Sequence, residues 1–591
     1  MPHAPYPNLD VLRAAVDVAA GRRAGDLLLR GGHVLNVCTG CIERADVLVA
    51  GPLIAAVGDL GDVETHRVID VTGRWLAPGL IDGHVHIESS LVTPARYAEA
   101  VLPRGVTAVV CDPHEIANVA GVPGLRWLLT GSRELPFDVW VTVPSCVPST
   151  RLETAGAEFG VGEIDDLLAD PWVVGVAELM SFPDVVAGDV GQLAKVAVAE
   201  ALGKTIEGHA PGLTGRDLQA YLAAGVGSDH ESTGLAEGRE KLVAGAFLMI
   251  REGSVTRDLE ALLPLVDPRH ADRIGFVTDD RFPNDLLDEG GVDVLVRRAI
   301  AAGVDPVYAV RCASWNTARH YRLTRRGAIA PGYQADMIVV DDLARFHAHA
   351  VLKDGRLVAA DGRLLEPLPD ADADDAAVRA TVRIPALDGD VLRLPAPSRP
   401  EGLVRVIRPV PGQVVTEAQT LRPSRRDGAV VADPDRDLAK LACVERHGRN
   451  GNVGLGLVTG LGLRRGALGS SVGHDHHNLM LAGMDDGSMR LAAARLAELG
   501  GGFVVVDEGR VLAELALPVA GLVSPAPIAA VRADLDAVEA AARSLGVYAA
   551  GVMMTLSFLG LAVIPALRLT DHGLVDVVAA RVVPFDVESV A

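Results

Sequence analysis

The sequence predicts an α/β fold: a (β/α)8 TIM barrel, a small β-sandwich formed by segments that flank the barrel, and a C-terminal α+β domain. The 591 residues exceed the usual size of one domain, and 49% of them are hydrophobic, enough for several cores. Across residues 76–325, eight short apolar runs alternate with helical stretches, as parallel strands and crossover helices do. Seven of these runs end in His, Asp or Glu, which is typical of the catalytic face of a barrel.

The domain order follows from the patterns along the chain. After an N-terminal segment, residues 1–24, residues 25–75 consist of short alternating runs with Gly at the turns, which predicts strands. A second such patch, 326–365, lies beyond the barrel region, so we expect the two patches to pair in one composite β-sandwich. Residues 366–400 are rich in Pro, Asp and Ala and are expected to form a linker. Residues 401–591, with both strand and helix patterns, are expected to form the C-terminal domain.

The composition limits which binding partners and which cellular compartment we expect. The formal net charge of −22 argues against nucleic-acid binding, which selects basic surfaces. Six scattered cysteines suggest no disulfide framework, and Cys38 and Cys41 form a CxxC without a second pair, which we interpret as chance. The N-terminus lacks the pattern of a signal peptide, so we expect a cytoplasmic protein. The uncharged run 544–567 is long enough to span a bilayer, but its Gly and Pro residues favour a buried strand-and-turn segment and no membrane partner.

The ends of the predicted strands carry the residues of a candidate metal site. His84 and His86 lie two apart on a strand, so both rings point to one side and can bind one ion. An isolated HxH motif is weak, but further imidazoles and carboxylates end later runs. Such a nitrogen- and oxygen-rich set suits Zn, Fe or Mn and excludes soft thiolate chemistry. The full candidate set is His84, His86, Glu178, His209, His230 and Asp279.

The sequence also offers two other hypotheses, a deaminase of a different fold and a barrel without catalytic activity, and it supports both of them less well. His86-Ile87-Glu88 mimics the H-x-E motif of the zinc deaminases that act on nucleobases, but the P-C-x-x-C that this fold requires is absent. A barrel that only binds or scaffolds is opposed by the intact set of candidate ligands.

Longer stretches carry a resemblance to a known family. The APGLIDGHVH start, the strand-end histidines and the late GAIAPGYQADMIVVDD resemble the amidohydrolase superfamily, and the chain is more narrowly similar to the bacterial adenine deaminases. The likeness runs from about residue 20 to the end of the chain. The other matching stretches include CDPHEIANVAG, VVGVAELM, HAPGLTGRDLQAYLAAGVGSDHEST, MIREGS, VTDD, GALGSSVGHDHHN, GGGFVVVDEG and MTLSFLGLAVIP.

The resemblance implies a function and a cofactor. The expected reaction is hydrolytic deamination of adenine to hypoxanthine and ammonia, for purine salvage, by a metal-activated bridging hydroxide. The alternative is another amidohydrolase that deaminates a different aminopurine or hydrolyses a cyclic amide. Two divalent transition-metal ions are implied, manganese or iron ahead of zinc, and the partners are a purine, water and further copies of the chain. One ion would take His84, His86 and Asp279, and the second His209 and His230. Many relatives bridge the ions with a carboxylated Lys, but none ends the fourth run here, which leaves Glu178 as the bridge.

The resemblance also implies roles in proton transfer. Asp279 would take the hydroxide proton and pass it to the leaving amine. The acid that protonates N1 of the purine is Glu115, which we favour, or else His114 or Glu231.

Further candidates are expected near the substrate. Arg251 and Glu252 either contact the purine or form a structural ion pair, a choice that the sequence leaves open. The motif at 474–478 is expected either to act as a lid or near the substrate, or to be structural. It departs from the family pattern H-D-x-H-N, which has a small residue where this chain has His476, so a dedicated metal site there is doubtful. The remaining substrate-proximal candidates are Asp280, His474, Asp475 and His477.

Overall fold

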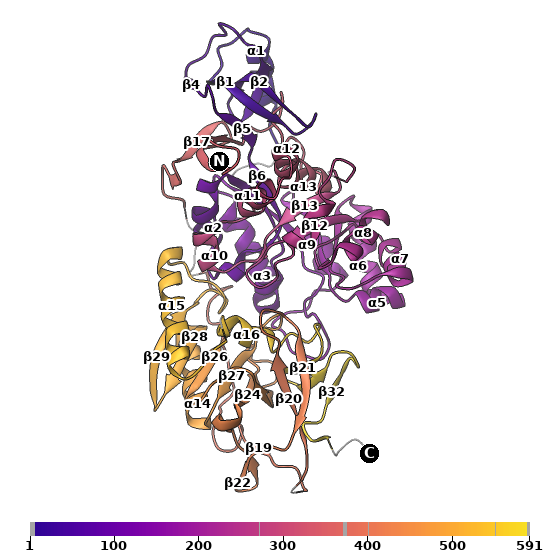
Figure 1. The fold of residues 1–591 in the computed structure, drawn as a ribbon, viewed down its shortest axis with the longest axis vertical. Helices are drawn as coiled ribbons and strands as arrows, with labels where there is room; N and C mark the ends of the chain where they lie inside the picture. The colour runs from indigo at the N-terminus through magenta and orange to yellow at the C-terminus, as the bar shows by residue number, and fades with distance from the viewer. Residues whose placement is uncertain (1–5, 271, 370–374, 400, 550, 588–591) are drawn as a thin grey trace.

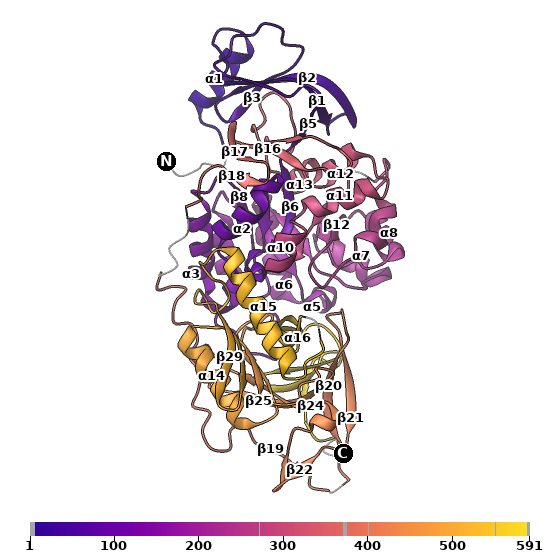
Figure 2. The ribbon, with the colours of Figure 1, turned by 60° about the vertical axis from the view of Figure 1, so that its left-hand side comes forward.

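The structure is a computed structural model that describes residues 6–270, 272–369, 375–399, 401–549 and 551–587. Figure 1 shows three parts stacked along the long axis: a β-rich part that contains the start of the chain, a central α/β part, and a C-terminal part. Figure 2, turned by 60°, shows the same order, with helix α15 (Ile528–Ser544) reaching up from the C-terminal part along the central one.

The central part contains a strand in each of the eight predicted apolar runs, and the strands run parallel. One sheet has the order β10-β9-β8-β7-β6-β14 and a second the order β11-β12-β13. The strands are β6 (Leu80–His86), β7 (Val106–Cys111), β8 (Asp138–Val143), β9 (Val173–Leu179), β10 (Thr205–Gly208), β11 (Ser228–Asp229), β12 (Phe247–Arg251), β13 (Ile274–Val277) and β14 (Asp279–Asp280).

The two parallel sheets join at both ends, which gives a TIM-like barrel. Strands β13 and β14 belong to one run, separated only by Thr278, so this run pairs with β12 on one side and with β6 on the other. At the opposite junction, the Gly227 amide donates to the Ile206 carbonyl at 2.8 Å, which ties β11 to β10. The strands are buried on both faces, as continuous Val-, Ile- and Leu-rich segments require.

Helices between the strands cover the barrel. Helix α6 illustrates how they begin: the side chain of its cap, Asp189, accepts a hydrogen bond from the Gln192 amide at 2.9 Å. The helices of this layer are α2 (Pro94–Val101), α3 (His114–Ser132), α4 (Val161–Leu168), α5 (Phe182–Ala187), α6 (Val190–Ala201), α7 (Gly215–Ala223), α8 (Leu235–Val243), α10 (Pro283–Asp288), α11 (Asp293–Ala301), α12 (Pro306–Cys312) and α13 (Trp315–His320).

The segments on either side of the barrel meet in one nine-stranded sheet of order β18-β17-β16-β15-β5-β1-β2-β3, in which β4 also pairs with β1. The antiparallel pair β5–β15, with Met337 opposite Pro78, connects the two segments. Helix α1 (Leu9–Ala19) packs beside β2 and β3. The strands are β1 (Leu27–Asn36), β2 (Cys41–Ala50), β3 (Leu53–Gly58), β4 (Val68–Asp70), β5 (Trp75–Pro78), β15 (Met337–Val340), β16 (Ala348–Lys353), β17 (Arg356–Ala360) and β18 (Arg363–Leu364).

The C-terminal part is built on an eight-stranded sheet of order β21-β20-β25-β24-β27-β26-β28-β29. Helix α14 (Asp486–Leu499) packs on it through Ala492 and Leu496. A small sheet follows, made of β30 (Leu567–Thr570), β31 (Gly573–Asp576) and β32 (Arg581–Val583). The large sheet contains β20 (Val404–Pro409), β21 (Thr416–Leu421), β24 (Leu438–Val444), β25 (Val453–Thr459), β26 (Ala467–Ser470), β27 (Leu479–Gly483), β28 (Gly502–Asp507) and β29 (Arg510–Ala516).

The uncharged run 544–567 is mostly buried, but its expected strand was wrong. Residues Val552–Phe558 form helix α16, and a strand, β30, starts only at the last residue of the run. The Met and Leu residues of this stretch are good helix formers, and Gly551 supplies the left-handed conformation at its start. In the part of the chain that the structure describes, no helix is both long enough and apolar enough to cross a bilayer.

Candidate metal centre

Six candidate ligands from five different strand ends converge at one end of the barrel. His84 and His86 point the same way from β6, with ring centroids 4.8 Å apart. Glu178 comes from β9 and Asp279 from β14, while His209 and His230 directly follow β10 and β11. All six are buried. We call them the barrel cluster: His84, His86, Glu178, His209, His230 and Asp279.

Glu178 lies between two groups of ligands. Its Oε1 is 3.2 Å from Nε2 of both His84 and His86, and Asp279 Oδ1 lies 3.6 and 3.1 Å from the same two nitrogens. Its Oε2 is 2.7 Å from His209 Nδ1 and 3.6 Å from His230 Nε2. One carboxylate therefore faces two separate sets of nitrogen donors, as a bridging ligand must.

The spacing fits divalent metal ions better than hydrogen bonds. Ligands at 2.0–2.2 Å from a tetrahedral ion stand about 3.4 Å from one another, close to most of the separations above. Among the described residues, His84 Nε2 and His209 Nδ1 have no hydrogen-bond partner of good geometry although they are buried. His86 Nδ1 lies 3.0 Å from the Asp112 carbonyl, a contact that fixes the ring and leaves Nε2 for an ion. The donor set therefore fits divalent metal ions.

Asp279 is held in an unusual conformation by its neighbours. Its φ of 59° lies in the left-handed region, which residues other than Gly adopt only uncommonly. Arg251 Nη1 donates to Asp279 Oδ2 at 3.0 Å. Burial raises the pKa of Asp279, but Arg251 and the facing histidines outweigh it and hold that pKa well below its usual range. Arg251 and the histidines thus keep the carboxylate ionised.

Of the two predicted glutamates around Arg251, Glu231 lines the cavity and Glu252 does not. Arg251 forms a two-pronged ion pair with Glu231, with Nη2 3.1 Å from Oε2, and both residues line the cavity above the barrel cluster. Glu252 instead faces away: it pairs with Arg298 and accepts the Leu259 amide at 3.2 Å. Glu252 is not part of the cavity lining.

A second group of histidines links the barrel to the C-terminal part. Glu115, at the start of α3, has Oε1 2.6 Å from His474 Nδ1, and Oε2 pairs with His477 Nε2. We call Glu115, His474 and His477 the interdomain cluster. Burial raises the pKa of Glu115, but His474 and His477 outweigh it, and that pKa falls well below its usual range.

The other candidates lie around this cluster. His114 Nε2 is 3.4 Å from Glu115 Oε1 and 3.7 Å from Asp475 Oδ1, and burial raises the pKa of Asp475 to about 6. Asp280 accepts from Ser89 Oγ at 2.5 Å. His114, Glu115, Asp280, His474 and Asp475 line the cavity, whereas His477, also a predicted substrate-proximal residue, is not part of its lining. His476 does not line it either: it is fully buried, and its Nδ1 accepts the Asn478 amide at 2.9 Å.

The cavity has an apolar side that sequence reasoning missed. It consists of C-terminal residues, and only a contact between domains brings them to the barrel, so no local pattern could have revealed them. Asp112, which orients His86 and whose Oδ2 lies 3.0 Å from His114 Nδ1, was also missed, although it stands in the same CDPHE motif. The apolar lining includes Val414, Phe558, Leu561, Val563 and Ile564.

Two family profiles match the two parts of the chain that line the cavity, the barrel and the C-terminal part. The profile of the amidohydrolase family matches residues 75–382, and that of the adenine deaminase C-terminal domain matches residues 413–581. Proteins named adenine deaminase are similar over almost the whole chain. The one from Desulfatibacillum aliphaticivorans is 45% identical over 95% of this chain and 97% of its own. Those from Nitratidesulfovibrio vulgaris strain Hildenborough and Methanothrix thermoacetophila are 46% and 47% identical, covering 96% and 95% of this chain and 97% of their own. The chain therefore belongs to the adenine deaminase family of amidohydrolases.

Proposed function

We propose that the protein hydrolyses adenine to hypoxanthine and ammonia, as part of purine salvage. The observation that carries this proposal is the two-sided cavity: metal-ligating and proton-transferring groups on the barrel side face an apolar side from the C-terminal part. A flat heteroaromatic base with one polar edge matches such a cavity. The names of the relatives support the same activity.

The barrel cluster would hold two divalent ions, manganese or iron in preference to zinc. His84, His86 and Asp279 would bind one ion, His209 and His230 the other, and Glu178 both. When bound, such a pair supplies a hydroxide nucleophile at neutral pH by lowering the pKa of water. Two cations close together repel each other, and the Glu178 carboxylate between them offsets that repulsion.

Asp279 carries the proton to the leaving group in this mechanism. Its Oδ1 faces the histidines of β6 that would hold an ion, and its Oδ2 is held by Arg251. An ionised carboxylate in that position can accept a proton and return it to the departing amine, which cannot leave as NH2⁻.

Glu115 protonates N1 of the purine in this proposal. His474 faces it at 2.6 Å; burial lowers the pKa of His474, but Glu115 outweighs it and raises that pKa to about 9. His474 therefore stores a proton at neutral pH, and its transfer to Glu115 gives a carboxylic acid that lines the cavity. Glu231 is less suited because it is hydrogen-bonded to Arg251, whose guanidinium does not give up a proton, whereas Glu115 faces a histidine that can.

We also propose the following domain boundaries, compartment and oligomeric state. We assign residues 76–325 to the metal-binding (β/α)8 barrel and residues 25–75 with 326–365 to a composite β-sandwich. Residues 1–24 precede it, 366–400 form the linker, and 401–591 form the C-terminal α+β domain. The protein would act in the cytoplasm as a homo-oligomer.

Ammonia release from a panel of bases, with metal content measured on the same sample, tests the function. We expect adenine to be deaminated far better than adenosine or cytosine, by protein that carries about two transition-metal ions per chain. Comparable kcat/KM for adenosine would contradict the assignment, and about one ion at full activity would contradict the paired site. Turnover of another aminopurine or of a cyclic amide such as hydantoin in place of adenine would favour the alternative amidohydrolase activity.

A further inference from the structure

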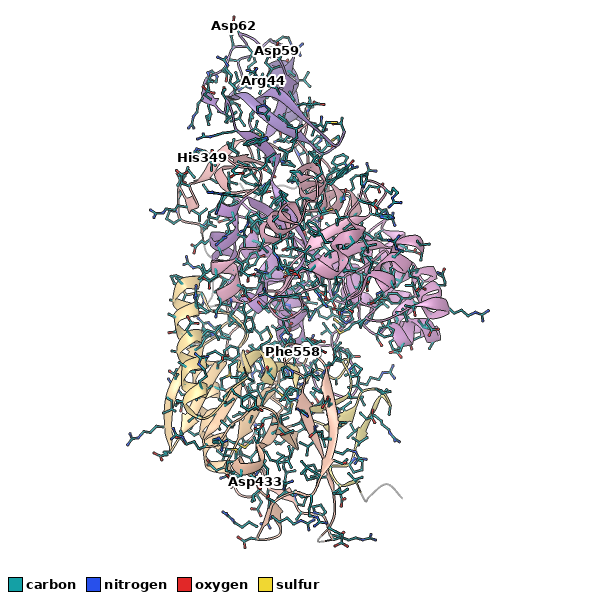
Figure 3. All side chains as sticks on the ribbon, viewed as in Figure 1. Arg44, Asp59, Asp62, His349, Asp433 and Phe558 are labelled. Carbon is teal, nitrogen blue, oxygen red and sulfur yellow. The ribbon has the colours of Figure 1, made fainter. Side chains whose placement is uncertain are left out.

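The apolar side of the cavity is a continuous patch of the C-terminal part. Phe558 ends helix α16, Leu561 and Ile564 follow it, and Val414 precedes β21. Figure 3 shows Phe558 at the boundary between the barrel and the C-terminal part. With Met554 and Val563 these side chains form a separate apolar cluster that contacts Val255 and Phe282 of the barrel. We call Val414, Phe558, Leu561, Val563 and Ile564 the apolar wall.

One buried arginine ties the segments of this wall together. Arg568, on β30, is 0% exposed. Its Nη1 donates to the Phe558 carbonyl at 2.7 Å, its Nε to the Ile564 carbonyl at 2.7 Å, and its Nη2 to the Val414 carbonyl at 2.6 Å. A fourth hydrogen bond, also from Nη2, reaches the Pro565 carbonyl at 3.0 Å. The guanidinium thus contacts each of the three backbone segments that carry the wall.

The bonding of Arg568 is unusual for a buried cation. Among the described residues it has no ion pair with an Asp or Glu, although removing an unpaired charge from water is costly. Burial lowers the pKa of Arg568 to about 9, so the side chain stays charged at neutral pH. Its planar fork of donors can satisfy carbonyls from several directions, which a point charge on a flexible stem cannot do. The hydrogen bonds of the guanidinium offset part of the free-energy cost of burying its charge, and they fix the position of the wall.

The wall also contacts the polar side of the site. The Phe558 ring stacks on His474, with centroids 5.1 Å apart and an angle of 27° between the rings. His474 in turn faces Glu115. A change in the position of Phe558 would therefore affect both the volume of the cavity and the interdomain cluster.

We propose that the apolar wall determines the size of the substrate, and that Arg568 is a positioning residue that holds it. This inference rests on the proposed function. When C6 of adenine faces the barrel cluster and N1 faces Glu115, the N3, C8 and N9 edge points away from them and toward the wall. Apolar side chains held there exclude any substituent on that edge, and a ribose on N9 above all. The C-terminal part would thus be the reason that a free base is accepted and a nucleoside is not.

The test compares Phe558→Ala with Phe503→Ala, a matched change of a buried Phe in the same part of the chain that does not line the cavity. The readout is the ratio of kcat/KM for 9-methyladenine to that for adenine in the metal-loaded enzyme. We expect Phe558→Ala to raise this ratio about tenfold or more, since one methyl group in a shaped pocket is worth about 10–200-fold. Phe503→Ala should leave the ratio at the wild-type value.

Arg568→Lys tests the positioning role. A lysine keeps the charge but cannot reach three segments at once, so the ratio should rise, with KM for adenine increasing more than kcat falls. Circular dichroism checks that each variant is folded, and Ile564→Ala replaces Phe558→Ala if the latter is not.

A binding measurement separates failure of the inference from failure of the proposed function. If the wild type produces no hypoxanthine, the proposed function is wrong, and the dissociation constants of hypoxanthine and 9-methylhypoxanthine still test the wall. A folded Phe558→Ala or Ile564→Ala variant that keeps the wild-type selectivity in turnover and in binding would overturn the inference.

Discussion

The barrel cluster and the interdomain cluster are built from the same residue types but differ in how their atoms meet. In the barrel cluster, all but one of the nitrogen–oxygen separations quoted above lie between 3.1 and 3.6 Å, and two nitrogens lack hydrogen-bond partners among the described residues. In the interdomain cluster, one carboxylate lies 2.6 Å from His474 Nδ1 and is hydrogen-bonded to His477. The first arrangement has the spacing of ligands around an ion, and the second has the shorter contacts of a proton donor and acceptor. We therefore expect similar composition to serve metal binding in one place and proton storage in the other.

The largest effect is expected for Glu178→Gln. The substitution keeps the shape of the side chain and removes the negative charge between the two ligand sets, and neutral imidazoles cannot replace that charge. We expect deamination to fall by at least about a thousandfold and both ions to bind more weakly. Metal analysis and turnover of the purified variant measure both effects.

Glu207→Gln is the matched control for Glu178→Gln. Glu207 is also a buried barrel carboxylate that faces a histidine, with Oε2 2.9 Å from His320 Nε2, but it does not line the cavity. This variant should keep its metal content. Two tightly bound ions and near-normal activity in Glu178→Gln would make the bridging role untenable.

A smaller loss of activity is expected from Glu115→Gln. This variant tests whether the interdomain cluster, unlike the barrel cluster, acts in proton transfer and does not bind metal. Because Gln cannot relay a proton, kcat should fall by about 10²–10⁴-fold, the range of a general acid. Metal content should stay at about two ions per chain. A wild-type content near three that falls to two in this variant would show that the interdomain cluster is itself a metal site. His477→Gln, which removes a hydrogen bond but leaves the Glu115 carboxyl, should reduce kcat less.

The sequence predicted the barrel side of the cavity far better than the opposite side. Parallel strands end on one face of a barrel, so a polar residue that ends an apolar run can be placed there from sequence alone, as with Glu178 and His230. The wall residue Phe558 is one apolar residue among many in its segment. Its role depends on which domain faces the barrel, and no local pattern records that.

The same limit applies to secondary structure. The eight barrel runs were recognised because buried parallel strands are short, apolar and separated by helices. The run 544–567 is apolar throughout, so its periodicity could not distinguish a buried helix from a buried strand. Arg568 lies just beyond it, and nothing in the sequence indicates that a lone arginine organises three backbone segments.

The smallest effect concerns a carboxylate that, unlike those of both clusters, has no histidine partner within ion-pair distance among the described residues. Glu153 is buried in the loop after β8, where Oε1 accepts from Ser149 Oγ at 2.7 Å. Burial, and then Asp475, raise the pKa of Glu153 to about 8. The unfolded chain releases this proton near pH 4.5, whereas the folded protein keeps it until about pH 8, so the free energy of unfolding falls as pH rises between those values. Glu153→Gln cannot titrate and should escape this loss.

Thermal unfolding of the wild type and Glu153→Gln at pH 5 and pH 8 measures the difference. At pH 5 both side chains are neutral in the folded state, and an amide oxygen can accept the same hydrogen bond, so the two proteins should unfold at similar temperatures. By pH 8 the variant should be the more stable by about 3–4 kcal/mol, since the free energy of unfolding falls by about 1.4 kcal/mol for each pH unit between the two pKa values. An equal difference at both pH values would show that Glu153 is ionised in the folded state. Burial alone would then not keep a carboxyl neutral in this protein, and the ionised carboxylates of the two clusters could no longer be attributed to the histidines that face them.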